Sequence, residues 1–286
     1  MKLLCLDIGN TRAHYGLAEI GGPSRPVRAL AAGQAASRPP LEPPVSIAVL
    51  EEGAVSTASI AGTHTGLPAI LRSLAFDGHL VEGFSIASVV PDATEKLRPF
   101  LESESRPIFQ ISHRQCPGLE IDYPKPAEIG QDRLALALGA QAWYGAPTIV
   151  VDMGTAVTLD ILDQRGAYVG GVIAPGLAIM TRYLHEQTAL LPELDPDELA
   201  VTCGIGKSTV EAMQLGCVVG FEGMLNALLE RVRQELTQEG DPPANVVMTG
   251  GSAGSLTANW SKRVTFDGDL LLRGLAEAFR RWQASR

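Results

Sequence analysis

The sequence predicts an α/β protein made of two similar halves, each with a mixed β-sheet flanked by helices. Strand-like apolar runs alternate with stretches of helical periodicity, and several strands follow one another closely enough to form hairpins. The run Leu4–Thr11 (LCLDIGNT) also has a counterpart about halfway along the chain, Ile149–Ala156 (IVVDMGTA). Both runs read as an apolar strand, Asp, an apolar residue, Gly and a small polar residue. A repeat on this scale indicates two related domains that face each other.

The first half begins with a strand hairpin. Lys2–Ile8 predicts a buried strand that carries Asp7 near its end, Gly9–Asn10 predicts a turn, and Ala13–Ala18 predicts a returning strand. Gly21–Pro44 is rich in Gly, Pro and Ala, which is typical of a loop. Three further elements complete a first domain of residues 1–114: a core strand at Phe84–Val89, a helix from about Asp92, and a strand at Pro107–Ser112.

The second half, residues 115–286, continues the alternation of strands and helices. Ser208–Glu239 is the longest helical stretch, because its apolar residues recur at three- and four-residue spacing. Gly216, Gly220 and Gly223 lie along it and predict either a close approach of another backbone or a break into two helices. The other expected elements are helices at Gln131–Tyr144 and Gly268–Gln283 and strands at Thr148–Asp152, Ala156–Leu162, Val169–Ile173 and Asn245–Met248.

Composition narrows the class of protein. The 286 residues are 45% hydrophobic and 19% charged, which is ordinary for a globular protein, and the net charge of −9 argues against nucleic acid as a partner. Apolar runs stay shorter than the roughly 18 residues of a membrane span, and the N-terminal run lacks the features of a signal peptide. We therefore expect a cytoplasmic protein without a membrane partner. Its four cysteines are scattered, which predicts reduced thiols: Cys5, Cys116, Cys203 and Cys217.

The repeated hairpin has a chemistry suited to phosphate. Each strand delivers an aspartate at its end (Asp7 and Asp152), where a carboxylate can hold a cation or its water shell. The glycine lets the backbone turn tightly and present N–H groups to phosphate oxygens. Asn10, Thr11 and Thr155 add further donors. One Asp-x-Gly turn after a strand is more often only a turn, but two copies, each between buried strands, favour a pair of loops that clamp a nucleotide tail.

A series of motifs carries a resemblance to a known family. The motifs are DIGNT at Asp7–Thr11, SVVP at Ser88–Pro91, YPKPAEIGQDR at Tyr123–Arg133, DMGTAVTLD at Asp152–Asp160, GGVIAPG at Gly170–Gly176, TALLP at Thr188–Pro192 and TGG at Thr249–Gly251. Their order along the chain is similar to that of the type III pantothenate kinases, which belong to the superfamily of acetate and sugar kinases, heat-shock proteins and actin. The resemblance implies two ribonuclease-H-like domains of the actin-like ATPase type.

What the resemblance implies is phosphoryl transfer from ATP to the hydroxyl group of pantothenate, the first step towards coenzyme A. It also implies Mg²⁺, a monovalent cation (K⁺ or NH₄⁺) and a homodimer. Apolar and small residues on Gln131–Tyr144 and Ser208–Glu239 exceed the need of one helix face, so we expect one of these helices at the dimer interface. Two alternatives remain: a non-catalytic, transcription-accessory member of the family, and a sugar or acid kinase with another substrate.

The resemblance also assigns roles to individual residues. Asp132 matches the general base, Asp152 the ligand of the monovalent cation, and Asp7 the residue that holds Mg²⁺ through water. Asp160 stays undecided as a structural acid. The expected nucleotide contacts are Asp7, Ile8, Gly9, Asn10, Thr11, Arg12, Ala13, His14 and Thr155. The expected substrate contacts are Tyr123, Gly130, Gln131, Asp132, Arg133 and Thr188, with Arg133 a candidate partner of the substrate carboxylate.

Two features depart from expected patterns. Gln131 stands where the motif of the family usually has Ala, which affects only the shape of the pocket. Gly204–Thr209 (GIGKST) resembles the end of a nucleotide-binding P-loop, but Val201 occupies the position of its first glycine and no buried strand precedes it. The preferred interpretation is a helix N-terminus capped by Ser208 or Thr209.

Overall fold

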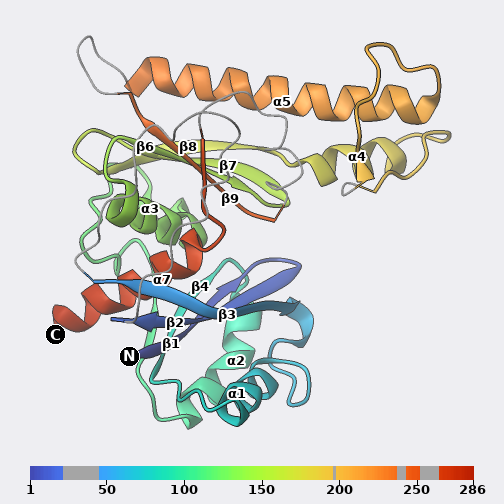
Figure 1. Ribbon diagram of the computed structural model, residues 1–286. Helices are drawn as coiled ribbons and strands as arrows, with labels where there is room; N and C mark the ends of the chain where they lie inside the picture. The colour runs from blue at the N-terminus through green and yellow to red at the C-terminus, as the bar shows by residue number, and fades with distance from the viewer. Residues whose placement is uncertain (22–44, 196–197, 237–242, 252–263) are drawn as a thin grey trace.

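Two five-stranded sheets are stacked with helices between them and on both outer faces (Figure 1). This computed structural model describes residues 1–21, 45–195, 198–236, 243–251 and 264–286. The predicted loop at Gly21–Pro44 therefore lies almost entirely outside the described residues. The N-terminus and the C-terminal helix lie on the same side of the molecule in Figure 1.

The first sheet has the strand order β3-β2-β1-β4-β5. Its first three strands form an antiparallel meander, and the last two run parallel to β1. Parallel neighbours need crossover connections, and helices α1 and α2 supply them after β3 and β4. The elements are β1 (Lys2–Ile8), β2 (Arg12–Ile20), β3 (Ile47–Ser56), a 3₁₀ turn η1 (Thr57–Ser59), α1 (Leu67–Phe76), β4 (Gly83–Ser88), α2 (Pro91–Ser103) and β5 (Ile108–Gln110).

The second sheet repeats this topology. Its order, read as β8-β7-β6-β9-β10, again has an antiparallel meander followed by two parallel strands. The two halves that the sequence repeat predicts are therefore present, each with a mixed sheet. The elements are η2 (Pro126–Glu128), α3 (Gln131–Tyr144), β6 (Thr148–Met153), β7 (Ala156–Leu162), β8 (Tyr168–Pro175), α4 (Leu177–Glu186), α5 (Thr209–Leu236), β9 (Asn245–Thr249), β10 (Thr265–Phe266) and α7 (Leu270–Ala284).

Helices α3 and α7 fill the layer between the two sheets (Figure 1). They approach closely because both carry glycine at the crossing: a Cβ on Gly274 would lie 2.1 Å from the carbonyl oxygen of Ala135. α7 ends the second half of the chain yet packs on the first sheet, where the Ser85 hydroxyl donates to the Leu275 carbonyl at 2.7 Å. This helix joins the two halves, and the boundary at residue 114 stays a prediction.

The outer faces of the sheets are covered by the remaining helices. α1 and α2 pack on the first sheet, and α5 lies along the second (Figure 1). α5 is long and apolar enough, by length and composition, to cross a membrane, but its buried face packs on the second sheet. That face consists of Met213, Cys217, Phe221, Leu225, Leu229 and Val232.

The structure corrects some sequence-based expectations and adds elements. α5 is continuous through Gly216, Gly220 and Gly223, and a Cβ on any of them would meet no atom of the described chain within 4 Å. The expected break and the expected close backbone approach within the chain are therefore both wrong. Ser208 does cap this helix, because its hydroxyl accepts from the Glu211 N–H at 3.2 Å. The elements without a sequence prediction are β3, α1, α4, β10 and the 3₁₀ turns η1 and η2.

Candidate active site

Strand periodicity places the two repeated aspartates face to face. In β1, Leu3 and Cys5 point into the layer between the sheets, and Asp7 continues that alternation. In β6, Val150 points into the same layer and Asp152 follows two residues later. Both carboxylates therefore emerge at the C-terminal ends of central strands, on the inner faces of the two sheets. Each stays partly exposed, so a ligand can reach it.

The loop after β1 is a tight turn tied to the neighbouring hairpin. The Gly9 N–H donates to the Arg12 carbonyl at 3.1 Å, and a Cβ on Gly9 would lie 3.0 Å from the same oxygen. Thr57 holds the turn from β3, since its N–H donates to the Thr11 carbonyl at 3.1 Å and its hydroxyl donates to the Gly9 carbonyl at 2.7 Å. Asn10 and Thr11 are left exposed at the tip.

The other residues expected at this loop divide into two groups. Ile8 and Ala13 are buried in the core with α1 and α2, so they can offer only backbone groups to a ligand. Arg12 and His14 are exposed, and His14 lies directly opposite Asp7 in the antiparallel pair, on the same face of the sheet. A hollow of about 460 Å³ opens beside Thr11 and Arg12. The nucleotide contacts expected of these loop residues stay predictions.

The loop after β6 depends on two glycines that lie outside the repeated motif. The Gly176 N–H donates to the Thr155 carbonyl at 3.2 Å, and a Cβ on Gly176 would come within 2.3 Å of that oxygen. Gly250 has a φ of +94°, and a Cβ there would lie 2.6 Å from Asp152 Oδ1. Only glycine allows this close approach to Asp152, which accounts for the glycine that follows β9 in the segment Thr249–Gly251.

The N-terminus of α3 brings a third carboxylate to the same place. Asp132 lies in the first helical turn, and its Oδ1 accepts the Arg133 N–H at 2.8 Å. Gly130 makes room for this carboxylate, because a Cβ on Gly130 would lie 2.3 Å from Asp132 Oδ1. The dipole at a helix N-terminus stabilises negative charge at this position. Asp132 is therefore an oriented carboxylate, and it lies near enough to Asp7 and Asp152 for its charge to act on both.

The three carboxylates interact electrostatically. Burial, with additional contributions from the charges of Asp132 and Asp152, raises the pKa of Asp7 to about 8. Burial also raises the pKa of Asp152 to about 7, with Asp132 and Asp160 contributing. Mutually repelling carboxylates in a partly dehydrated space are stabilised by a cation. Positive charge placed between these three carboxylates would offset their mutual repulsion.

These carboxylates do not form an all-protein metal cage. Among the residues that the structure describes, no three His, Cys, Asp or Glu side chains lie close enough together to hold a metal ion. Aspartate oxygens nevertheless suit hard cations, and Mg²⁺ in phosphoryl-transfer sites is usually held by one or two carboxylates plus phosphate oxygens. Asp7 and Asp152 fit a cation of that kind.

A buried polar network beneath Asp132 fixes Arg133. Arg133 Nε donates to Asp160 Oδ1 at 2.7 Å, and the hydroxyls of Tyr168 and Thr158 donate to the same carboxylate at 3.0 and 3.2 Å. Burial raises the pKa of Asp160 to about 6 against the opposing effect of Arg133. Burial lowers the pKa of Arg133, but Asp160 and Tyr168 outweigh it, and the net shift is upward. The pair is charged near neutral pH. Asp160, whose role the sequence leaves undecided, therefore orients Arg133.

Tyr123 lies at the edge of this network. Its ring meets that of Tyr168 edge-on at 6.3 Å between centroids. The segment before it is held in place, because the Asp122 N–H donates to the Tyr168 carbonyl at 2.9 Å and the Tyr168 N–H donates to the Glu120 carbonyl at 2.8 Å. Tyr123 therefore lies next to a member of the Arg133 network, and its contact with substrate stays a prediction.

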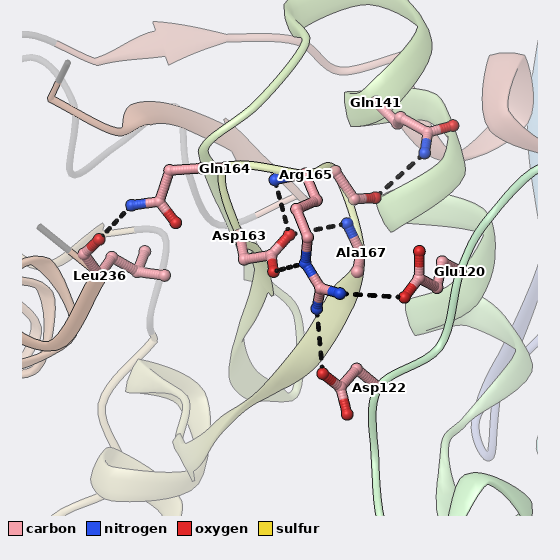
Figure 2. Close-up of polar contacts among 9 residues, drawn as sticks. Glu120, Asp122, Gln141, Asp163, Gln164, Arg165, Ala167 and Leu236 are labelled. Carbon is pink, nitrogen blue, oxygen red and sulfur yellow. Dashed lines mark hydrogen bonds and ion pairs between the residues drawn. The ribbon is translucent and has the colours of Figure 1, made fainter. Parts of the chain in front are cut away.

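Figure 2 shows a second anchor for this segment. Arg165 at the β7–β8 turn reaches three carboxylates, with its guanidinium nitrogens 2.9 Å from Asp163, 3.3 Å from Glu120 and 3.0 Å from Asp122. Arg165, Glu120 and Asp122 are all more than half exposed. Exposed pairs of this kind contribute little stability each. Their effect is to hold the approach to Tyr123 against the second sheet.

The two remaining substrate residues lie differently from one another. Gln131 turns its side chain towards the first sheet: its Oε1 accepts the Ser88 N–H at 2.9 Å and Gln110 Nε2 at 3.1 Å. Thr188 follows α4, is exposed, and donates its hydroxyl to the Leu184 carbonyl at 2.8 Å. Substrate contacts of both residues stay predictions. The residues that sequence reasoning missed are Ser88, Gln110, Thr158, Tyr168, Gly176 and Gly250; of these, Ser88, Thr158, Gly176 and Gly250 lie within or beside shared motifs.

Comparison with known protein families shows which family the chain belongs to. The family model described as type III pantothenate kinase matches residues 44–231. The chain belongs to the type III pantothenate kinase family. A type III pantothenate kinase of Akkermansia muciniphila is 43% identical over 221 residues, which cover 77% of this chain and 85% of that protein. The type III pantothenate kinase of Rubrobacter xylanophilus is 32% identical over 275 residues, covering 96% of this chain and 95% of its own.

Solved structures support the fold alone. A conserved protein from Campylobacter jejuni, described as a transcriptional activator of the Baf family, aligns with a TM-score of 0.55 at 17% identity and covers 99% of this chain and all of its own. The activator of 2-hydroxyisocaproyl-CoA dehydratase from Clostridium difficile, solved with ADPNP, aligns at 0.51 and 14%, covering 100% and 97%. The type III pantothenate kinase chain thus has the predicted actin-like ATPase fold. The similarity gives no support to a transcription-accessory role.

Proposed function

We propose that this protein transfers the γ-phosphoryl group of ATP to the hydroxyl of pantothenate and forms 4′-phosphopantothenate, the first step of coenzyme A synthesis. The observation that carries the proposal is the convergence of Asp7, Asp152 and Asp132 from two duplicated strands and one helix N-terminus. Membership of the family supplies the substrate. Four free thiols in the described chain agree with a cytoplasmic location.

In the reaction, Asp132 accepts the proton of the pantothenate hydroxyl. The hydroxyl oxygen then bonds to the γ-phosphorus, the bond to the bridging oxygen breaks, and ADP leaves. Such transfers depend mainly on positioning and charge stabilisation. The Gly9 and Thr155 turns would hold the phosphates, while the Arg133 N–H and the space above Gly130 orient the base.

Two cations complete this proposal. Asp7 would hold Mg²⁺ through water, and Asp152 would hold K⁺ or NH₄⁺. When bound, the cations neutralise the charge that builds up between carboxylates and phosphates. Rates in matched K⁺, NH₄⁺ and Na⁺ buffers test the second assignment: we expect K⁺ or NH₄⁺ to raise the rate over Na⁺, and equal rates would remove Asp152 from this role.

The carboxylate of pantothenate is assigned to Arg133. Asp160 occupies its Nε edge and the Leu159 carbonyl accepts from Nη2 at 3.5 Å, which leaves Nη1 for a ligand; 14% of the side chain remains accessible. The ring of Tyr123 contacts the ring of Tyr168, which belongs to the same network as Arg133. A charge-assisted bond from arginine to a carboxylate is worth more than a neutral one. This pairing favours pantothenate over an uncharged alcohol.

The homodimer is assigned to the outer face of α5. α3 is the less suitable helix, because Leu134–Ala140 are buried within their own chain. The outward stripe of α5 instead consists of small or apolar exposed residues: Ala212, Gly216, Val219, Gly220, Gly223 and Ala227. Small residues let two helices pack closely. A dimer by light scattering at micromolar concentration is the expected result, and a monomer would contradict it.

The function is tested by ADP release coupled to product identification. With Mg²⁺, K⁺ and ATP, we expect ADP to form only when pantothenate is added, and mass spectrometry to find phosphopantothenate. ADP release with a sugar or another hydroxy acid, but not with pantothenate, would indicate a different acceptor. A complete lack of turnover at saturating ATP would contradict the kinase assignment itself.

A further inference from the structure

We propose that Gln131 is a positioning residue, which fixes the start of α3, and with it Asp132, to the first domain beside the phosphate loop. The inference rests on the proposed function, because it concerns the placement of the assigned base. Gln131 belongs to the second half of the chain, while both groups that it binds belong to the first sheet. It is therefore a polar latch between the two halves at the active site.

The chemistry of the latch sets the orientation of its amide. A backbone N–H can only donate, so the Ser88 N–H must face the oxygen of Gln131 and not its nitrogen. The amide of Gln110 then supplies a second donor to the same oxygen, at 3.1 Å. Oε1 thus accepts two bonds, which matches its two lone pairs.

Ser88 is a rigid anchor for this latch. It ends β4 and pairs with Ile8 in register, one residue from the turn that begins at Gly9. Its hydroxyl accepts from the Val90 N–H at 3.1 Å and from the Thr94 hydroxyl at 2.6 Å. Displacement of Ser88 would therefore disturb both the start of α2 and the end of β1. The anchor is thus joined directly to the strand that carries the first loop.

The other end of the latch needs such an anchor. Within the described chain, no side chain caps the N-terminus of α3, where Gly130 occupies the cap position. Gln131 is the first residue of the helix, and Asp132 is the next. The Arg133 N–H bond to Asp132 and the Arg133–Asp160 pair constrain this turn from within the second half of the chain, but the glycine before it adds no constraint. The bonds of Gln131 provide one, and they tie the position of Asp132 to the opposite phosphate loop.

The consequence is a predicted loss of turnover rather than of binding. A misplacement of about 1 Å at a reacting group can cost on the order of 10²-fold in rate. The shared motif usually has Ala at this position, but in this chain Gln131 makes two bonds that Ala cannot replace, so its role goes beyond the expected effect on pocket shape. We expect Gln131→Ala to lower kcat by roughly tenfold or more while the KM for ATP changes by less than about threefold. Gln131→Met keeps the length of the side chain and removes the acceptor, so we expect the same loss.

A matched control lies on the same helix. Gln141 also makes two hydrogen bonds: its Nε2 donates to the Gly166 carbonyl at 3.0 Å, and its Oε1 accepts from Arg281 at 2.9 Å. It lies near the other end of α3. Gln141→Ala should lower the melting temperature about as much as Gln131→Ala and leave kcat within about twofold. Gln110→Ala, alone and with Gln131→Ala, closes a double-mutant cycle; the double variant should turn over no more slowly than Gln131→Ala.

Hydrogen exchange provides a readout that does not need activity. Loss of the latch should speed exchange of the Ser88 amide by about tenfold or more in Gln131→Ala and leave it unchanged in Gln141→Ala. A wild type that makes phosphopantothenate, with Gln131→Ala and Gln131→Met both at wild-type kcat, would overturn the inference and leave the proposed function intact. Unchanged Ser88 exchange in those variants would also overturn it. An inactive wild type would instead overturn the proposed function.

Discussion

Asp160 is the residue whose replacement tests the buried network most sharply. Its side chain is fully buried, and its two oxygens accept from Arg133, Tyr168 and Thr158. Asp160→Asn keeps the size and an acceptor oxygen for Arg133 and Tyr168. Thr158 can rotate its hydroxyl and accept from the new amide. The substitution therefore removes mainly the negative charge beside Arg133.

The size of the effect follows from the burial of the pair. Removing one partner of a buried ion pair typically costs about 3–5 kcal/mol. Arg133 is partly accessible and retains its hydrogen bond, so we expect a cost at or just below the lower end of that range, about 2–3 kcal/mol. For a chain of this size that corresponds to a fall in melting temperature of about 4–12 °C.

The assay combines thermal unfolding with substrate kinetics. An Arg133 that loses Asp160 also loses its orientation, so the KM for pantothenate should rise more than about fivefold while the KM for ATP stays within about twofold. Asp122→Asn is the matched control, because it removes an exposed carboxylate paired with Arg165. It should change the free energy of unfolding by less than about 1 kcal/mol.

The reasoning is refuted by a specific pattern. If Asp160→Asn melts within about 1 °C of the wild type and binds pantothenate equally well, the network neither stabilises the fold nor orients Arg133. Equal rises in the KM values of both substrates would indicate general disturbance of the cleft and would contradict the assignment to the substrate carboxylate.

Three further predictions use other parts of the site. The pKa values of Asp7 and Asp152 rise on folding from the usual 3.8 to about 8 and about 7, so the folded ligand-free protein binds more protons than the unfolded one; its melting temperature should fall as pH rises through about 5 to 8, and Asp7→Asn should flatten this profile in a thermal scan. Gly130→Ala should displace the Asp132 carboxylate and lower kcat by about 10–100-fold in steady-state assays, with a small change in melting temperature. Val219→Asp, on the outer face of α5, should convert the dimer to a monomer by light scattering, whereas Leu80→Asp, at a still more exposed apolar residue of the first half, should not.

The sequence predicts those parts of the fold that local periodicity determines. β1 and β6 follow from short continuous apolar runs, β7 from alternation and α3 from its helical pattern, and the repeat of Asp7 at Asp152 predicts the duplicated topology. The sequence does not predict β3, because only its first residues are buried and its remaining residues alternate between partly buried and exposed. β10 has two residues, which is too short for any periodicity. The glycines of α5 suggested a break, because a sequence does not show whether a glycine faces the core or the outside.

The candidate site shows the same limit at the level of side chains. Asp7, Asp132 and Asp152 stand out in the sequence because each occupies a motif. The bonds of Gln131 to Ser88 and Gln110 join residues far apart in the chain, and only the stacking of the two sheets brings them together. Gly250 is needed because Asp152 lies against its α-carbon, a contact created by the pairing of β6 with β9.

The central claim is that Asp132 acts as the base for transfer to pantothenate, and Asp132→Asn tests it most directly. The variant keeps size and polarity but cannot take up the hydroxyl proton. We expect kcat to fall by about 10²–10⁴-fold while calorimetry finds ATP and pantothenate still bound. A purely structural Asp at a helix start would instead change stability by about 0.5–2 kcal/mol and leave turnover nearly intact. A kcat reduced less than tenfold, with both ligands bound, would contradict the account.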